Sequence, residues 1–409
     1  MPSPSPTRQA LIVWPLFLAV ALLMLGNGLQ GSLLGLRATL EGFSTAATGA
    51  VMSGYYAGFL VGSVGVPKLV GGVGHVRVYA GLASLASAAT LAHLIVTEPV
   101  AWFLFRAITG TCLAGLYIVA ESWLNGASRD ATRGRILAIY MVVVTGGLAV
   151  GQMLLTVADP GGFLLFLLAS ILVSMAVVPV ALVRFPAPAI PAPDPIPYRL
   201  ILHTAPIGLI GALITGAANG AVLGMGAVWG AAEGLSVDRI AVLLTLALVG
   251  GVVLQWPLGA LSDLVSRRRV IFAVTVAAAL AAAGLAMLDA GQGWALVVML
   301  LLGGFSFPMY SLSGSHVNDL MGAEHAVGAS SAIMLANGIG AVAGPFGASV
   351  VMTAAGPSGL WMFVAAVHGV LGVYAGWRII RRWNIPAPGK RPYLPYPARS
   401  GGLRWLARR

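Results

Sequence analysis

Twelve apolar stretches of about 20 residues or more follow one another along the 409-residue chain, separated by short polar connections. A helix needs about 20 apolar residues to cross a bilayer, and it satisfies its backbone hydrogen bonds internally. We therefore expect an all-α polytopic membrane protein with twelve transmembrane helices. The expected spans are residues 10–36, 46–66, 78–97, 100–124, 134–157, 161–183, 203–230, 240–260, 270–288, 294–318, 327–352 and 358–380.

The composition also indicates that lipid is the solvent. The chain is 58% hydrophobic and 9% charged, whereas soluble domains carry about 25% charged residues. The net charge of +11 comes from basic residues in short loops and near the C-terminus. This is a topology signal rather than a nucleic-acid groove, so we expect no nucleic-acid partner. The single Cys112 forms no internal disulfide, and no Cys/His spacing suggests a metal or a cofactor.

Basic residues concentrate in alternate connections. Lysine and arginine are enriched in cytoplasmic loops of membrane proteins. If the N-terminus is cytoplasmic, the only lysine or arginine residues in the outer connections are Arg37 and Arg239. We therefore expect a bacterial inner-membrane protein with both termini in the cytoplasm. The inner positions are then Arg8, Lys68, Arg77, Arg129, Arg133, Arg135, Arg184, Arg199, Arg267, Arg268, Arg269 and the tail from Arg378.

A proline-rich segment separates two halves of similar length. Six prolines between Phe185 and Tyr198 predict an extended strap. We expect an N-terminal six-helix bundle (1–183), a cytoplasmic linker (184–202), a C-terminal six-helix bundle (203–380) and a basic cytoplasmic tail (381–409). The tail is expected to contact anionic lipid head groups.

The halves repeat one another at a shift of about 193 residues. Six spans per repeat give both halves the same orientation, so we expect two parallel six-helix repeats with a substrate site between them. The glycines of 147–151 align with those of 340–344. Other aligned pairs are Asn27 with Asn219, Gly110 with Gly303, Tyr117 with Tyr310, Ser122 with Ser315 and Asn125 with Asn318.

Three short motifs resemble the major facilitator superfamily. The loop Gly259–Arg269 resembles the family's signature G-x-x-x-D-x-x-G-[RK]-[RK], with Ser266 at the second glycine. The runs 106–110 and 340–345 are similar to its R-x-x-x-G and G-x-x-x-G-P motifs. The runs 120–125 and 133–141 resemble the bacterial YcaD-type branch. The resemblance implies the superfamily fold and a transporter, slightly favours export, and implies no particular substrate.

Span four contains two ionisable residues, which are costly in a membrane and therefore mark functional candidates. Arg106 is predicted to be a cavity cation that holds an anionic group or tunes a proton site. The alternative is an arginine that extends to the outer head groups. Glu121 is predicted to carry protons, and the alternative is a capping or inter-helix contact at the inner end, with Arg129 or Arg133 as the partner. Arg106 and Glu121 lie about 22 Å apart along the helix, so they do not pair directly.

Amide and phenol side chains supply further candidates for the substrate cavity. A buried amide needs water, substrate or another polar group as its partner. Asn27 and Asn219 are therefore predicted to contact substrate, or alternatively to bond a neighbouring helix. The remaining cavity candidates are Gln30, Tyr117, Gln152, Tyr310 and Asn337.

Loop charges are expected to gate the cavity. The resemblance implies that the loop acid, Asp263, meets the start of a helix in the other half when the cytoplasmic side is closed. We expect its partners to be Arg133 and Arg135, at a helix N-terminus that also attracts an acid. In the first half the signs are reversed, and the expected contacts are Lys68 and Arg77 with Glu324.

The leading interpretation is a secondary transporter that moves a small organic solute by alternating access, with proton-coupled efflux as one mode. The chain has no G-x-x-x-x-G-K-[ST] loop for ATP. One alternative is a membrane-embedded receptor or scaffold that binds solute without moving it. Another is a lipid-modifying membrane enzyme, which the scattered acids disfavour. We expect a monomer, no cofactor and no catalytic residues.

Overall fold

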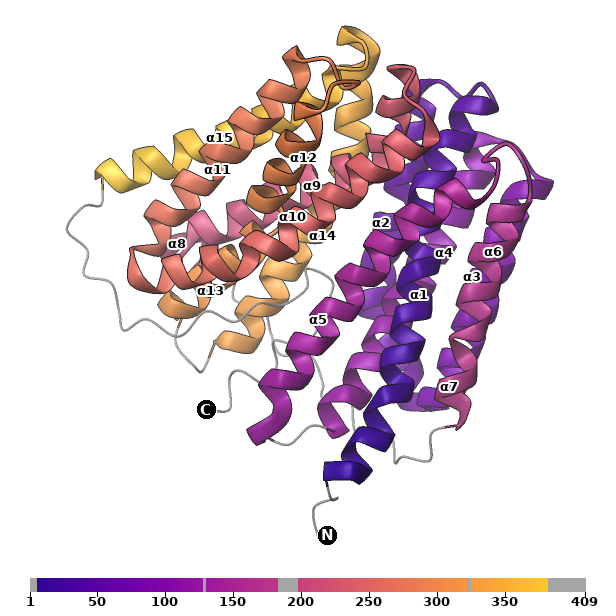
Figure 1. The fold of residues 1–409 in the computed structure, drawn as a ribbon. Coiled ribbons are helices and arrows are strands. Elements are labelled where there is room, and N and C mark those ends of the chain that lie inside the picture. Colours follow the sequence, from indigo (N-terminus) through magenta and orange to yellow (C-terminus); the bar gives the residue numbers. More distant parts are fainter. Residues whose placement is uncertain (1–5, 128–129, 183–197, 322–324, 382–409) are drawn as a thin grey trace.

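The computed structural model describes residues 6–127, 130–182, 198–321 and 325–381, and their regular structure is helical (Figure 1). The first half contains α1 (Pro6–Leu40), α2 (Thr45–Val73), α3 (His75–Ile95), α4 (Pro99–Ala127), α5 (Asp130–Met153), η1 (Leu154–Val157), α6 (Leu164–Met175) and α7 (Val177–Leu182). The second half contains α8 (Tyr198–Thr204), α9 (Pro206–Ala232), α10 (Val237–Leu264), α11 (Arg267–Met287), α12 (Trp294–Ser306), α13 (Met309–Met321), α14 (Ala326–Ala355) and α15 (Gly359–Arg381).

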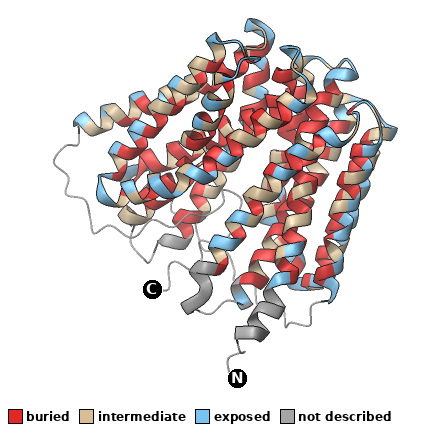
Figure 2. Ribbon diagram, viewed as in Figure 1, coloured by how far each residue is buried: buried red, intermediate tan, exposed pale blue. Residues whose placement is uncertain are grey.

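Twelve helical stretches among the described residues are long and apolar enough to cross a membrane, from Trp14–Leu40 to Gly359–Arg381. The expected fold class is therefore confirmed. Buried residues face the helix–helix contacts, whereas exposed residues cover much of the outer surface (Figure 2). Large apolar side chains, such as Val61, Leu264 and Val373, are exposed on that surface. Lipid chains accommodate such side chains without cost.

Prolines interrupt two of the expected spans. Span six is divided into α6 and α7 ahead of Pro179, and span ten is divided into α12 and α13 at Pro308. Proline lacks the N–H that bonds the carbonyl four residues earlier, so each break falls within one turn of it. The expected linker, 184–202, also differs in part, because α8 makes its last residues helical. The remainder of the linker and the basic tail lie outside the described residues.

Equivalent glycines bring equivalent helices together in the two halves. A Cβ on Gly110 of α4 would lie 1.9 Å from the carbonyl oxygen of Tyr55 in α2. A Cβ on Gly303 of α12 would lie 1.9 Å from the carbonyl oxygen of Ala247 in α10. Gly110 and Gly303 are the pair aligned by the repeat in the sequence. The same close backbone approach has therefore been kept in both repeats.

A second helix pair repeats the same geometry. In the first half, a Cβ on Gly151 of α5 would lie 2.5 Å from the carbonyl oxygen of Leu25 in α1. In the second half, a Cβ on Gly344 of α14 would lie 2.2 Å from the carbonyl oxygen of Ala217 in α9. Small residues permit such approaches, and close packing stabilises helix pairs in lipid. Two parallel six-helix repeats account for both matches.

The halves meet most closely at the end that carries the α1–α2 connection. A Cβ on Gly49 in the first turns of α2 would lie 2.4 Å from Cβ of Ser349 in α14. The Thr245 hydroxyl of α10 donates a hydrogen bond to the carbonyl of Ala149 in α5, at 3.2 Å. In Figure 1 the two groups of helices converge toward this end and spread apart toward the end where α1 begins.

Candidate functional site

A cavity of about 390 Å³, including its open mouth, lies between the two halves. Helices α1, α2, α4 and α5 line it from the first half, and α9 and α10 line it from the second. The polar lining residues are Asn27, Tyr55, Tyr56, Arg106 and Gln152. The other lining residues are Gly28, Gly31, Leu148, Leu223, Gly224 and Leu248.

Arg106 is the charged side chain of this cavity. It is only 3% exposed, and its Cζ atom lies 4.5 Å from the centre of the Tyr55 ring. The close packing of α2 on α4 creates this contact, because Gly54 and Gly58 face the backbone of α4. A cation above a tyrosine face is stabilised by the ring quadrupole. The side chain therefore lies at the cavity, rather than extending to the outer head groups.

Two predicted amides line the cavity and are held by hydrogen bonds. The Asn27 Nδ2 atom donates to the Tyr117 hydroxyl at 3.3 Å, and that hydroxyl donates to Sδ of Met24 at 3.4 Å. The Ser32 hydroxyl donates to Oε1 of Gln152. Tyr117 thus lies behind Asn27 and supports it, while Asn27 and Gln152 themselves reach the cavity.

The sequence interpretation missed Tyr55 and Tyr56. Their rings meet edge to face, with centres 5.2 Å apart, and both line the cavity. A usable signal was present, because tyrosine hydroxyls in the middle of a span need a polar neighbour. Tyr55 also lies at the point where α2 approaches the glycine of the R-x-x-x-G motif, Gly110.

Besides Tyr117, four other predicted cavity residues lie outside the lining. Gln30 donates to the Thr90 hydroxyl of α3 at 2.9 Å, and Asn337 donates to the carbonyl of Ala212 at 3.0 Å. Both amides thus bond neighbouring helices, the alternative that was given for such groups. The other two are Asn219, which is half-buried, and Tyr310, which is buried.

Asn219 belongs to a polar network inside the second half. The Ser306 hydroxyl of α12 donates to Oδ1 of Asn219 at 2.7 Å and lies 3.1 Å from Nε2 of His368 in α15. The Thr275 hydroxyl of α11 lies 3.1 Å from Nδ1 of the same imidazole. With Nε2 protonated, every bond has a donor and an acceptor, so the network joins four helices without a charge.

Glu121 is buried in the first half, with 7% of its surface exposed. The Tyr140 hydroxyl of α5 donates to Oε1 of Glu121 at 2.9 Å. This contact joins the last turns of α4 to α5. The alternative partner Arg129 and the side chain of Arg133 lie outside the described part of the chain.

The expected gating acid is bonded within its own half. Nη2 of Arg267 donates to Oδ1 of Asp263 at 3.0 Å, and its Nε donates to Oδ2 of Asp319 at 2.6 Å. Nη1 of the same guanidinium donates to the Ser262 hydroxyl at 3.0 Å. The sequence interpretation missed Asp319, although it is one of only twelve acids in the chain.

The expected contacts between halves at this end involve undescribed groups. The side chains of Arg133 and Arg135 lie outside the described part of the chain, as does Glu324. Lys68 and Arg77 are described, and both are exposed. Among the described residues, no group of three or more His, Cys, Asp or Glu side chains is placed to hold a metal ion.

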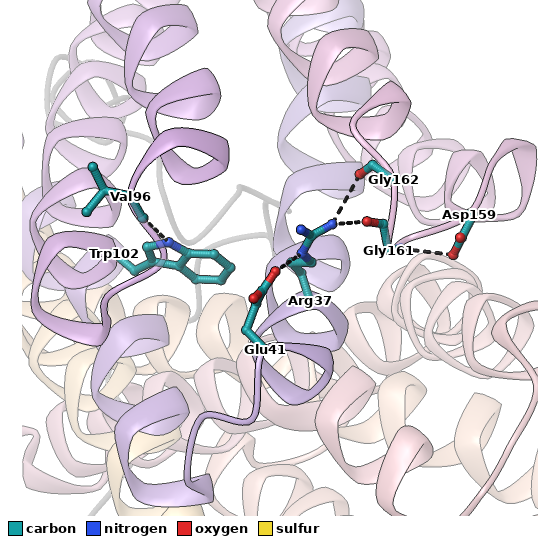
Figure 3. Close-up of polar contacts among 7 residues, drawn as sticks. All are labelled: Arg37, Glu41, Val96, Trp102, Asp159, Gly161 and Gly162. Atoms are coloured by element: carbon teal, nitrogen blue, oxygen red, sulfur yellow. Dashed lines mark hydrogen bonds and ion pairs between the residues drawn. The ribbon is translucent and has the colours of Figure 1, made fainter.

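At the opposite end, Arg37 joins α1 to the loop before α6 (Figure 3). Its Nε donates to Oε1 of Glu41 at 2.6 Å, and its Nη1 donates to the carbonyls of Gly161 and Gly162. Oδ1 of Asp159 accepts the N–H of Gly161 at 2.9 Å and shapes the loop. These bonds order the end of the first half that carries the α1–α2 connection.

Comparison with known proteins gives a consistent result. The family model described as Major Facilitator Superfamily matches residues 16–345 and 208–401. An uncharacterized MFS-type transporter of Yersinia pestis is 25% identical over 325 residues, covering 78% of this chain and 83% of that protein. The uncharacterized MFS-type transporter YcaD of Salmonella newport is 27% identical over 357 residues, covering 86% of this chain and 92% of that protein.

Solved structures share the fold at low sequence identity. A mutant of the nucleoside transporter NupG superimposes with a TM-score of 0.75 at 15% identity, covering 90% of this chain and 99% of that one. A bacterial homolog of the human lysosomal transporter Spinster, inward-facing and occupied, gives a TM-score of 0.73 at 14% identity. This match covers 93% of this chain and 98% of the Spinster homolog.

Proposed function

Because the chain belongs to the major facilitator superfamily, we propose that it is a secondary active transporter which moves a small organic solute by alternating access. Family membership makes it a multi-pass membrane transporter rather than an enzyme. The kind of solute, the driving ion and the direction are further proposals. The solved relatives do not supply the solute, because one fold serves many unrelated substrates.

The observation that carries the proposal is the composition of the cavity wall. Arg106 and Tyr55 come from the first half, whereas Leu223 and Leu248 come from the second. Because the wall is divided between two repeats, a rocking motion of one repeat against the other changes access to the cavity. A solute held there would be exposed to each side in turn.

The contacts between the halves support an inward-facing conformation. We place both termini in the cytoplasm of a bacterial inner membrane, because basic residues favour the cytoplasmic side. The end that carries the α1–α2 connection is then external, and it is the end where Gly49 meets Ser349. The halves would need to separate at this contact to open the cavity outward.

A proton gradient is the driving force that we propose, with export as its direction. Glu121 is the proton-binding candidate, because it is a buried acid within a span and contacts Tyr140 of a second helix. It lies on α4, the helix that also carries Arg106 into the cavity. Movement of α4 during rocking would therefore act on both groups.

Solute counterflow in proteoliposomes tests the transport proposal. Proteoliposomes that contain the purified chain would be loaded with an unlabelled metabolite or drug, and entry of the same labelled solute would be measured without an ion gradient. Saturable counterflow of at least one solute is the expected result. Binding of a solute without counterflow would instead indicate the receptor or scaffold alternative.

A further inference from the structure

The charges around the cavity restrict the chemistry of its solute. Among the lining residues that the structure describes, Arg106 is the one permanent cation, and none is an acid. A charge in the membrane interior is costly, because hydrocarbon solvates it poorly. An anion bound beside Arg106 would offset this cost, whereas a bound cation would raise it. The cavity therefore favours a solute with one negative charge.

The geometry at Arg106 favours a carboxylate. Its guanidinium lies over the ring of Tyr55, with Cζ 4.5 Å from the ring centre, and this contact orients the group. The N–H donors of a guanidinium lie in its own plane, where a carboxylate accepts two of them side by side. The amides of Asn27 and Gln152 also line the cavity and offer further polar contacts.

The size and the apolar wall restrict the rest of the solute. The volume of about 390 Å³ includes open space at the mouth, so the enclosed part of the cavity is smaller than this and suits only a small solute. The aromatic ring of Tyr56 and the side chains of Leu148, Leu223 and Leu248 line the remaining wall. Such a wall favours a compact apolar body.

We propose that the cavity binds a small monocarboxylate with a compact apolar body, and that Arg106 holds the carboxylate. The inference rests on the proposed transport function of the same cavity. One guanidinium neutralises one negative charge, so a phosphate dianion would leave a second charge unbalanced in a poorly solvating site. Tyr55 orients the guanidinium, and the leucines contact the apolar body.

A matched set of probes tests the class of solute. Benzoate, benzamide and benzylammonium share a ring and differ in charge. Thermal unfolding of the full chain in lipid nanodiscs would be followed by tryptophan fluorescence. Benzoate should raise the melting temperature, and the neutral and cationic probes should not. Equal stabilisation by benzamide or benzylammonium, or none by any of the three, would overturn the proposal.

A variant of Arg106 tests whether benzoate binds at this residue. Arg106→Gln should weaken benzoate binding at least about tenfold, because the charge-assisted hydrogen bonds are lost. Arg199→Gln removes an exposed arginine of α8 and should bind benzoate like the wild type. An Arg106→Gln protein that keeps wild-type affinity for benzoate would also overturn the proposal. The comparison of probes on the wild-type chain stands even if this variant folds poorly.

Labelled benzoate in proteoliposomes separates the two proposals. Binding without counterflow of benzoate or of any solute in the panel would support the solute class and count against transport. Counterflow of neutral or cationic solutes that benzoate does not inhibit would support transport and count against the solute class. Benzoate counterflow that unlabelled carboxylates inhibit would support both.

Discussion

Arg267 at the start of α11 donates from Nε to Oδ2 of Asp319 in α13, at 2.6 Å. The same guanidinium bonds Asp263 at the end of α10, at 3.0 Å. Arg267 is buried, and three helices of the second half, α10, α11 and α13, meet around it. The loop acid of the family signature therefore bonds an arginine of its own half.

Removing Asp319 should destabilise the second half. Asp319→Asn leaves a buried guanidinium with one carboxylate fewer, and breaking a buried pair in this way costs about 3 kcal/mol or more. A lower melting temperature in nanodiscs is the expected result. The control is Glu233→Gln, which neutralises an exposed acid at the end of α9 and should leave the melting temperature unchanged.

Adding one methyl group at the repeated glycines should separate paired helices. A Cβ at Gly110 would lie 1.9 Å from the backbone oxygen of Tyr55, so Gly110→Ala forces α4 away from α2. Overpacking of this kind costs about 1–3 kcal/mol. Because Tyr55 lies under Arg106, solute binding should weaken together with thermal stability.

Gly81→Ala is the matched control for that prediction. Gly81 is also within a helix, α3, but a Cβ there meets no atom within 4 Å. Alanine has the higher helix propensity, so this variant should be neutral or slightly more stable, by up to about 1 kcal/mol. Equal loss of stability in both variants would show that the close contact of α4 with α2 is not the cause.

A bulky residue at Gly49 should favour the opposite conformation. A side chain there would collide with Ser349 and the carbonyl of Pro345, which hold the halves together at this end. With Cys112→Ser and a cysteine at Leu223, Gly49→Leu should raise labelling of the cavity by an impermeant maleimide from the outer side. Gly71→Leu, in open space, is the control. Unchanged labelling in Gly49→Leu would contradict the assigned closed end.

Neutralising Glu121 should uncouple transport from the proton gradient. Glu121→Gln keeps the size of the side chain, and its amide oxygen still accepts the hydrogen bond from Tyr140. Uptake or export driven by a pH difference should therefore be lost, while counterflow persists. Transport that still follows the pH difference in this variant would exclude Glu121 as the proton site.

The sequence was sufficient to predict the two repeats, but not to predict which side chains line the cavity. Asn27 of α1 and Arg106 of α4 both reach the cavity. Gln30 is only three residues from Asn27, yet it bonds Thr90 of α3. Helical periodicity places residues on faces but does not say which neighbour covers a face.

The sequence by itself determined twelve spans and two parallel repeats, because hydrocarbon requires long apolar helices. The breaks near Pro179 and Pro308 came only from the structure, since Pro15, Pro67, Pro257 and Pro345 lie within unbroken helices. Only the tertiary structure decided that Tyr55 lies under Arg106 and that Asp319 meets Arg267. These pairs join different helices, and their contacts depend on how closely and at what rotation the helices pack. Glycine contacts between backbones decide that packing, and they have no signature in hydropathy.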